Sequence, residues 1–306
     1  RNMAGQLRAT LTAKAGQTVT IRHAELLTPS GDSLYTANLR SARCTNTYVP
    51  RADGRFTYQP LLVYQGFRYV EICGVGEKPK AEDITGMVQY DEMEERAGFE
   101  CDNELLNRLH ANALWGIRGN YHGMPTDCPQ RDERQGWTAD TQVYSKTGMY
   151  NSNLETFYRK WMQDMRDSQR SDGAYPDVAP YNWVGFGNSA WGDAGIVVPW
   201  KIYLMFGDKE VLRENFASME KYMNWLATQT GDGYKYQGAG LAYGDWLSFV
   251  ATETRYVSVA YYAYDAQLMA KMARALSTSA NDTYAVKAEA YEKLFEDIRA
   301  EFRTRY

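Results

Sequence analysis

The sequence predicts a two-part fold, an antiparallel β-domain over residues 1–95 followed by an all-α domain over residues 96–306. In the first part, Leu7, Ala9 and Leu11 alternate with polar neighbours, as residues do in strands that bury one face. From about residue 100, apolar residues recur at spacings of three and four, which is the period of a helix. No strand-like pattern returns after that change, and the two domains therefore differ in class.

Three further strands are predicted in the β-domain, at Val19 and Ile21, at Phe56 and Tyr58, and over residues 67–72. Turn-forming residues separate them, at positions 29–32, 52–54 and 74–76. The first residues already show the pattern of the middle of a strand. We therefore expect the N-terminal part of this domain to be absent from the sequence.

The helical part is predicted to hold seven helices. The first is capped by Asp102 or Asn103, and the others cover residues 138–149, 153–170, 190–206, 209–229, 256–277 and 283–303. Two long loops, residues 173–183 and 231–246, are rich in Gly, Pro and aromatic residues, and such loops on a helical scaffold are usually functional. Because the chain stops at Tyr306 without a Gly or Pro signal, we expect this domain to be truncated as well.

Composition excludes several classes of function. A hydrophobic content of 44% with 24% charged residues is typical of a soluble globular protein. The net charge of −4 gives no basic surface, so a nucleic-acid partner is not expected. No apolar stretch reaches the roughly 20 residues that a membrane span needs. Because Arg1-Asn2-Met3 does not look like a native start, cytoplasmic, periplasmic and secreted locations all stay open, as does the oligomeric state.

Neither disulfides nor a cofactor are predicted. Cys44, Cys73, Cys101 and Cys128 are irregularly spaced, which favours free thiols in a chain of this length. The three histidines do not stand at metal-ligand spacing, and no GxSxG elbow accompanies them. We therefore expect no metal site, no organic cofactor and no serine-hydrolase chemistry.

Residues 127–140 form the most distinctive run, with four carboxylates, two arginines and a tryptophan in fourteen residues. Carboxylates this close shift one another's pKa values. A helix beginning near Asp132 would place Glu133, Trp137 and Asp140 within roughly 60° of one another, on one face. Glycoside hydrolysis needs such a group, because one carboxyl protonates the leaving oxygen while a second activates water.

Both features also have a structural explanation. The run can be a helix start whose aspartates compensate the helix dipole and pair with Arg131 or Arg134. All eight tryptophans lie between Trp115 and Trp246, and they can fill the core of a large helical domain. Alternatively, they can stack against the C–H faces of a sugar. Taken with the carboxylates, the tryptophans favour a sugar site.

The run from Asp127 to Asp140 resembles the central motif of the inverting bacterial α-L-rhamnosidases of glycoside hydrolase family 78. Residues 38–43 and 64–71 resemble the β-domain that precedes the catalytic barrel in that family, and residues 190–200 and 243–247 resemble two later barrel segments. The resemblance implies a β-sandwich-like domain followed by an (α/α)6 barrel. Such a barrel has twelve helices and only seven are predicted, so we expect it to be incomplete.

The resemblance also implies site residues. Glu133 falls on the general acid, and Asp127 and Asp140 fall on the residues that bind rhamnose hydroxyls. Trp137, Trp191 and Trp246 fall on the aromatic lining of the sugar subsite. Arg131 is placed in the same substrate site, where it and Arg134 are expected to hold the acidic cluster together through bidentate pairs. The family's general base is a Glu expected beyond Tyr306, which leaves the activity of the 306-residue chain open.

We therefore predict an exo-acting, inverting α-L-rhamnosidase whose partner is a rhamnose-containing oligosaccharide, polysaccharide or glycoside. Two alternatives are an (α/α)6 glycosidase for another sugar and a non-catalytic carbohydrate-binding protein. Four further carboxylates and one histidine have weaker indications. Asp193 and Asp245 are expected in turn or N-cap roles, Asp177 and Glu253 are alternative catalytic carboxylates, and His122 is expected to be structural.

Overall fold

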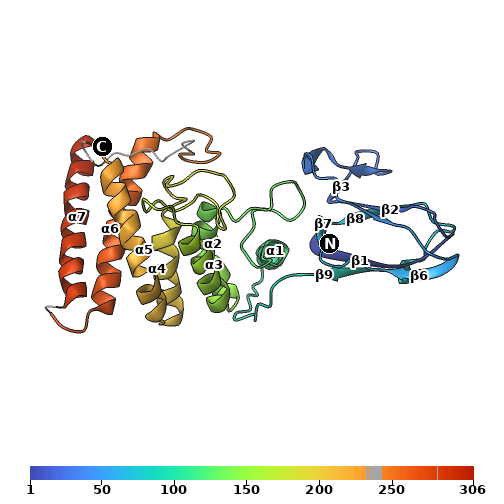
Figure 1. Ribbon diagram of the computed structural model, residues 1–306, viewed down its shortest axis with the longest axis horizontal. Helices are drawn as coiled ribbons and strands as arrows, with labels where there is room; N and C mark the ends of the chain where they lie inside the picture. Colours follow the sequence, from blue (N-terminus) through green and yellow to red (C-terminus); the bar gives the residue numbers. More distant parts are fainter. Residues whose placement is uncertain (232–233, 235–242, 281) are drawn as a thin grey trace. The chain divides into compact units, whose positions relative to one another are not determined.

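The computed structural model describes residues 1–231, 234, 243–280 and 282–306. The chain divides into two compact units (Figure 1). The first comprises residues 1–92 and 98–135, and the second comprises residues 93–97 and 136–306. The acidic run therefore begins in the first unit and continues into the second after Gln135.

The first unit is built on two antiparallel sheets, which Figure 1 shows as two layers. In one sheet, β1 (Met3–Ala13) pairs with β6 (Gly54–Tyr58), β7 (Gln65–Phe67) and β9 (Ile84–Val88). In the other, β2 (Val19–Ala24) lies between β5 (Thr45–Tyr48) and β8 (Tyr69–Cys73), and β3 (Leu26–Leu27) pairs separately with β4 (Leu34–Tyr35). Leu7, Leu11, Val19 and Ile21 are buried together between the sheets. The predicted alternation along β1 and β2 thus buries one face of each strand.

The single strand predicted over residues 67–72 is wrong in one respect. Phe67 ends β7 in the first sheet, and Tyr69 begins β8 in the second. Arg68 lies between them, and its N–H donates to the carbonyl oxygen of Ala24 at 2.9 Å. The apolar pattern is continuous because both strands face the same core, although the chain changes sheets at Arg68.

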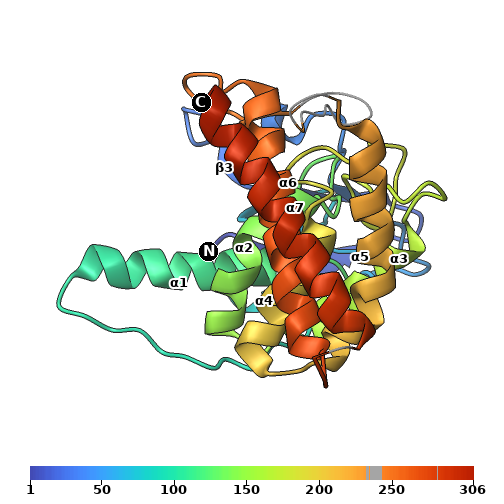
Figure 2. The ribbon, with the colours of Figure 1, turned by 90° about the vertical axis from the view of Figure 1, so that its left-hand side faces the viewer.

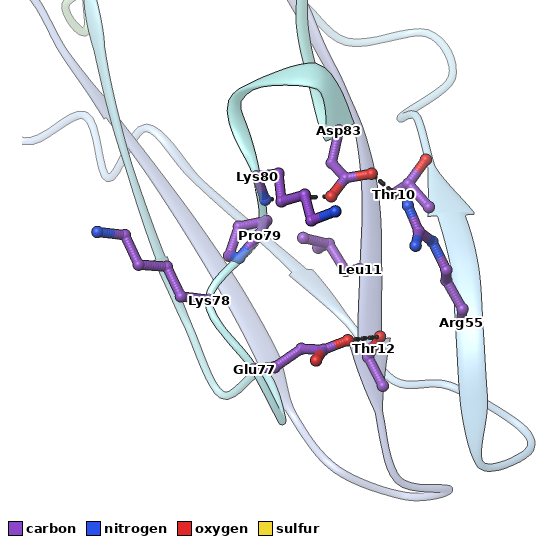
Figure 3. Close-up of a pocket in the computed structure, with 9 residues that line it drawn as sticks. All are labelled: Thr10, Leu11, Thr12, Arg55, Glu77, Lys78, Pro79, Lys80 and Asp83. Atoms are coloured by element: carbon purple, nitrogen blue, oxygen red, sulfur yellow. Dashed lines mark hydrogen bonds and ion pairs between the residues drawn. The ribbon is translucent and has the colours of Figure 1, made fainter.

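Polar contacts fasten the segment before β9 to the first sheet (Figure 3). The hydroxyl of Thr12 donates to Glu77 Oε1 at 3.0 Å, and Arg55 forms an ion pair with Asp83. A cavity of about 70 Å³ lies between these residues, with Leu11 and Pro79 also in its lining. A space of that size holds only a few water molecules.

Helix α1 (Glu104–Asn120) belongs to the first unit and packs on β1. As predicted, Asn103 caps it, because Oδ1 accepts from the N–H groups of Leu105 at 2.9 Å and Leu106 at 3.4 Å. The domain boundary predicted at residue 95 stays a prediction. In the structure, residues 98–135 cluster with the β-sheets, because α1 and the acidic run contact them.

The described part of the second unit contains six α-helices. They are α2 (Thr138–Asn151), α3 (Glu155–Asp167), α4 (Ala194–Phe206), α5 (Glu210–Gln229), α6 (Thr254–Leu276) and α7 (Thr283–Arg305). Helices α6 and α7 form a hairpin and lie side by side in both ribbon views (Figures 1 and 2). Trp161, Tyr175, Tyr222 and Ile196 are among the fully buried side chains. The described residues thus contain seven α-helices, and the predicted β-domain followed by a helical domain is confirmed.

Two predicted helix starts differ from the structure. The helix predicted from residue 190 begins at Ala194, because Asp193 Oδ2 accepts the N–H of Ala190 and closes a turn. The helix supposed to begin near Asp132 begins at Thr138. Of the predicted loop 231–246, residues 232–233 and 235–242 lie outside the described part of the chain.

The cysteines agree with the sequence analysis. All four cysteines are free thiols, as predicted, with Cys44 and Cys128 buried. Within the described ranges, no helix combines the length and the apolar character that crossing a membrane requires.

Candidate active site

The acidic run is a loop up to the start of α2, and this corrects the predicted one-face arrangement. Arg134 has φ +53°, a left-handed conformation that a continuous helix does not contain. Trp137 is the N-cap residue of α2, and Asp140 is exposed in its first turn. Glu133 therefore precedes the helix, and helical periodicity does not place it beside Trp137 and Asp140.

Within the first unit, Arg131 joins two of the predicted site residues. Its Nη2 lies 3.1 Å from Asp127 Oδ2 and 2.8 Å from Glu133 Oε2, and its Nε donates to the same Glu133 oxygen at 2.9 Å. Asp127 Oδ1 accepts the N–H of Gln135 at 2.9 Å. Burial nevertheless raises the pKa of Asp127 above its ordinary value. The predicted pairing of Arg131 with the acidic residues is confirmed.

Contrary to the prediction, Arg134 binds residues outside that cluster. Its Nη1 donates to the carbonyl oxygen of Tyr64 at 3.2 Å, and its Nη2 donates to Gln65 Oε1 at 3.3 Å. Its guanidinium also lies 5.0 Å from the ring centroid of Tyr64. Arg134 therefore fixes the acidic loop to the start of β7.

A second segment of the β-sheet unit holds the same loop. The guanidinium of Arg40, which follows the short 3-10 helix η1 (Ala37–Leu39), donates to Glu133 Oε2 at 2.9 Å. The backbone N–H of Ser41 donates to Asp132 Oδ2 at 3.1 Å, and its hydroxyl bonds to the same oxygen. Cys44 Sγ donates to the carbonyl oxygen of Gln130 at 3.0 Å. Contacts with residues 40–44 therefore orient both Asp132 and Glu133.

Close backbone packing adds to this attachment. A Cβ atom at Gly66 in β7 would lie 2.8 Å from Cβ of Gln130, closer than side chains approach. Only glycine lets the loop approach β7 at this point.

Asp127, Cys128 and Glu133 bring possible metal-ligand atoms within 4.8 Å of one another. Arg131 already pairs with both carboxylates, and burial raises the pKa of Cys128 to about 11. A thiol binds metals as the thiolate, which such a pKa disfavours at neutral pH. The cluster is thus arranged around a guanidinium group.

In the second unit, the three predicted tryptophans gather around one tyrosine. The ring centroid of Tyr243 lies 4.5 Å from Trp191, 5.8 Å from Trp137 and 6.0 Å from Trp246. Trp191 is 6% exposed, whereas Trp246 is 65% exposed, so the cluster runs from the interior to the surface. Aromatic faces arranged in this way provide stacking surfaces for a sugar ring.

Asp177 is linked to this aromatic cluster through Tyr243. It is fully buried, and its carboxylate accepts from the backbone N–H of Asn188 at 3.1 Å and from the side-chain amide of Asn188 at 2.6 Å. It also hydrogen-bonds the hydroxyl of Tyr243. Burial raises the pKa of Asp177 to about 6 and that of Tyr243 to about 12. Asp177, considered above as an alternative catalytic carboxylate, is in a position to hold Tyr243.

The other weakly indicated residues have local roles. Asp193 is at the N-cap position of α4, and its Oδ1 accepts from the hydroxyl of Tyr222 at 2.9 Å. Asp245 Oδ2 accepts from Thr252 Oγ1 at 2.8 Å, and Glu253 is at the N-cap position of α6. His122 stacks on Tyr64 with 4.2 Å between ring centroids, and its Nε2 lies 3.1 Å from the carbonyl oxygen of Gly119, as a structural histidine does.

Sequence reasoning missed two residues of these clusters, Tyr243 and Arg40. Both lie in segments whose family resemblance was noted, residues 243–247 and 38–43. Their roles depend on contacts with residues far away in the chain, which a local motif does not contain.

Family models of known proteins match the helical part and the β-sheet part of the chain separately. Residues 94–306 match the family model of the bacterial alpha-L-rhamnosidase 6 hairpin glycosidase domain, and residues 1–90 match that of the bacterial alpha-L-rhamnosidase concanavalin-like domain. The chain is 42% identical to an alpha-L-rhamnosidase of Streptomyces avermitilis over 309 aligned residues, which are 100% of this chain and 29% of that protein.

Solved structures agree with this match. The crystal structure of Streptomyces avermitilis alpha-L-rhamnosidase complexed with L-rhamnose superposes with a TM-score of 0.92 at 41% identity, over 100% of this chain and 29% of that one. The alpha-L-rhamnosidase from Dictyoglumus thermophilum also gives a TM-score of 0.92, at 34% identity over 100% of this chain and 34% of that one. The chain thus spans about a third of the length of these relatives.

Proposed function

This chain belongs to the bacterial alpha-L-rhamnosidase family, and from that membership we propose that its protein hydrolyses glycosides that end in α-L-rhamnose. The observation that carries the proposal is the close likeness to the Streptomyces avermitilis enzyme, whose structure contains L-rhamnose. The substrate class is accordingly a rhamnose-containing oligosaccharide, polysaccharide or glycoside. The aromatic cluster around Tyr243 supports it, because the methyl group of a 6-deoxy sugar favours an apolar wall.

Glu133 is the proposed general acid. It protonates the glycosidic oxygen while the bond to the anomeric carbon breaks and positive charge develops on the sugar ring. Arg40 and Arg131 both donate to Oε2 of Glu133 and so orient its carboxyl group. Asp127 and Asp140 are proposed to accept hydrogen bonds from rhamnose hydroxyls, and Trp137, Trp191 and Trp246 are proposed to contact the ring.

The proposed stereochemical course is inversion. A water molecule attacks the anomeric carbon from the face opposite the leaving group, and a second carboxylate removes its proton. That carboxylate would lie roughly 6.5–9.5 Å from the carboxyl of Glu133, which leaves room for the water. No residue of this chain is assigned to that role.

The test compares Glu133→Gln with the parent sequence in the full-length protein. We expect a loss of about 10²–10⁴-fold in kcat for a rhamnoside with a poor leaving group, because general acid catalysis contributes that much. With a p-nitrophenyl leaving group, which needs little protonation, the loss should be much smaller. Proton NMR of the first-formed anomer of rhamnose checks inversion.

Glu253→Gln is the matched control, because Glu253 is the other glutamate considered as a catalytic carboxylate. It should leave both rates near those of the parent. Normal turnover by the Glu133 variant on both substrates would contradict the assignment. Hydrolysis of a different nitrophenyl glycoside by the parent would indicate another sugar, and binding of L-rhamnose without hydrolysis would indicate a carbohydrate-binding protein.

A further inference from the structure

The second unit buries a pair of carboxyl groups from distant parts of the chain. Asp193 precedes α4 and Asp265 lies in α6, two helices that pack against each other. Both side chains are 0% exposed, and their carboxyl groups lie within hydrogen-bonding reach of each other. Two ionised carboxylates cannot share a hydrogen bond, because neither has a donor and their charges repel. The pair therefore holds at least one proton.

The surroundings show which residue carries it. Asp193 accepts two hydrogen bonds, from the N–H of Ala190 at 2.5 Å and from the hydroxyl of Tyr222 at 2.9 Å, and both favour its ionised form. Among the described residues, no N–H or O–H group donates to either oxygen of Asp265. The hydrogen bond between the two residues is thus one that Asp265 donates to Asp193.

No cation compensates the pair within the described chain, since neither aspartate forms an ion pair with Lys, Arg or His. The titratable groups that interact with it are the buried Asp177 and five tyrosines, namely Tyr175 of the loop before α4, Tyr222 of α5, and Tyr261, Tyr262 and Tyr264 of α6. Burial in these surroundings raises the pKa of Asp265 well above its ordinary value. An ionised carboxylate at this position would be buried without a partner, which is strongly unfavourable.

The pair controls the turn that carries Trp191. Ala190 has φ +74°, a left-handed conformation that costs free energy for a residue with a Cβ atom. Its N–H is bound by Asp193, and its carbonyl oxygen accepts from Gln142 Nε2 at 2.7 Å. The next residue, Trp191, packs on Tyr243 with 4.5 Å between ring centroids. Whatever fixes the Asp193 carboxylate therefore fixes the position of Trp191.

We propose that Asp265 is a positioning residue of the sugar site: as a neutral carboxylic acid it donates a hydrogen bond to Asp193 and thereby holds the turn that presents Trp191 to Tyr243. The effect on sugar binding rests on the function proposed above, whereas the protonation of Asp265 and its hold on Trp191 do not. No contact between Asp265 and substrate is involved.

The first experiment is infrared spectroscopy of the carboxyl C=O stretch at pH 8, where Asp177 is ionised because its pKa is about 6. We expect the parent to show the band of a buried neutral carboxylic acid, and Asp265→Asn to lack it. Asp297→Asn, at an exposed carboxylate of α7, should leave the band unchanged. Absence of the band from the parent, or its persistence in Asp265→Asn, would overturn the proposal.

The second experiment uses rescue by the conservative variant. Asp265→Asn keeps an N–H donor toward Asp193, whereas Asp265→Leu removes it at similar volume. The contribution of Trp191 to the near-UV circular dichroism is the part of the spectrum that is lost in the reference variant Trp191→Phe. This contribution should persist in Asp265→Asn and be lost in Asp265→Leu. L-Rhamnose binding, followed by tryptophan fluorescence, should weaken about tenfold or more in Asp265→Leu only, because a hydrogen bond to a charged group is lost.

If Asp265→Asn and Asp265→Leu show the same near-UV circular dichroism and the same affinity for L-rhamnose, the positioning role is overturned. If Asp265→Leu fails to fold, the infrared band and the Trp191 dichroism of Asp265→Asn still decide the question. Failure of the parent to bind L-rhamnose would contradict the proposed function. The infrared and dichroism results would still decide whether Asp265 is protonated and holds Trp191.

Discussion

Asp177 provides a quantitative prediction about pH and stability. Its carboxyl is 0% exposed, and burial raises its pKa from 3.8 to about 6. The folded chain therefore holds this proton more tightly than the unfolded chain does. The stability contributed by the neutral form is fully present below pH 3.8 and is lost as the pH rises through about 6.

The magnitude follows from the size of the shift. A change from 3.8 to about 6 corresponds to about 3 kcal/mol over the whole titration, since each pKa unit is worth 1.36 kcal/mol. Between pH 4 and pH 7 the change is about 2 kcal/mol, because part of the titration in the unfolded chain lies below pH 4. Asp177→Asn cannot ionise and lacks this contribution.

The assay is urea unfolding of the parent and of Asp177→Asn at pH 4 and pH 7, followed by tryptophan fluorescence. Relative to the parent, the variant should gain about 2 kcal/mol in free energy of unfolding between the two pH values. The other buried carboxyls are present in both proteins, so their contributions largely cancel in the difference. A difference that is the same at both pH values would refute the assigned pKa and its cause.

Two further predictions concern packing and the acidic loop. Gly195→Ala in α4 should lower the free energy of unfolding by about 1–3 kcal/mol, because its Cβ would lie 2.2 Å from Cε2 of the buried Tyr175. As a control, a Cβ at Gly116 in α1 meets nothing within 4 Å, so Gly116→Ala should raise the free energy of unfolding by up to about 1 kcal/mol. Urea unfolding measures both variants, and equal effects would contradict the packing argument. Arg40→Gln should change stability by less than about 1 kcal/mol, because the guanidinium is 55% exposed, yet lower kcat/KM for a rhamnoside about tenfold by releasing one contact of Glu133. Steady-state kinetics on the full-length protein test this, with unchanged kcat/KM as the contrary result.

Features encoded over a few neighbouring residues were predicted correctly from the sequence. Alternation along β1 and the spacing of apolar residues in α7 report directly which face of each element is buried. Asn103 was recognised as a cap because capping joins a side chain to N–H groups two and three residues later. The family resemblance of residues 127–140 depends on a continuous run of letters and needs no folding to be seen.

The site required contacts between residues far apart in the chain. Glu133 is oriented by Arg40, 93 residues earlier, and this attachment replaces the helix supposed to begin near Asp132. Tyr243 brings three tryptophans together from separate segments, although each was recognised only within its own motif.

The sequence by itself therefore determined the class of each domain, the order of the two domains and the identity of the residues rich in chemistry. Tertiary structure alone decided which of these residues meet, and with which charge. Asp265 shows the physical reason. In the sequence it is one more polar residue of a long helix. Burial against Asp193, with no ion pair to either carboxyl in the described part of the chain, makes it a proton donor.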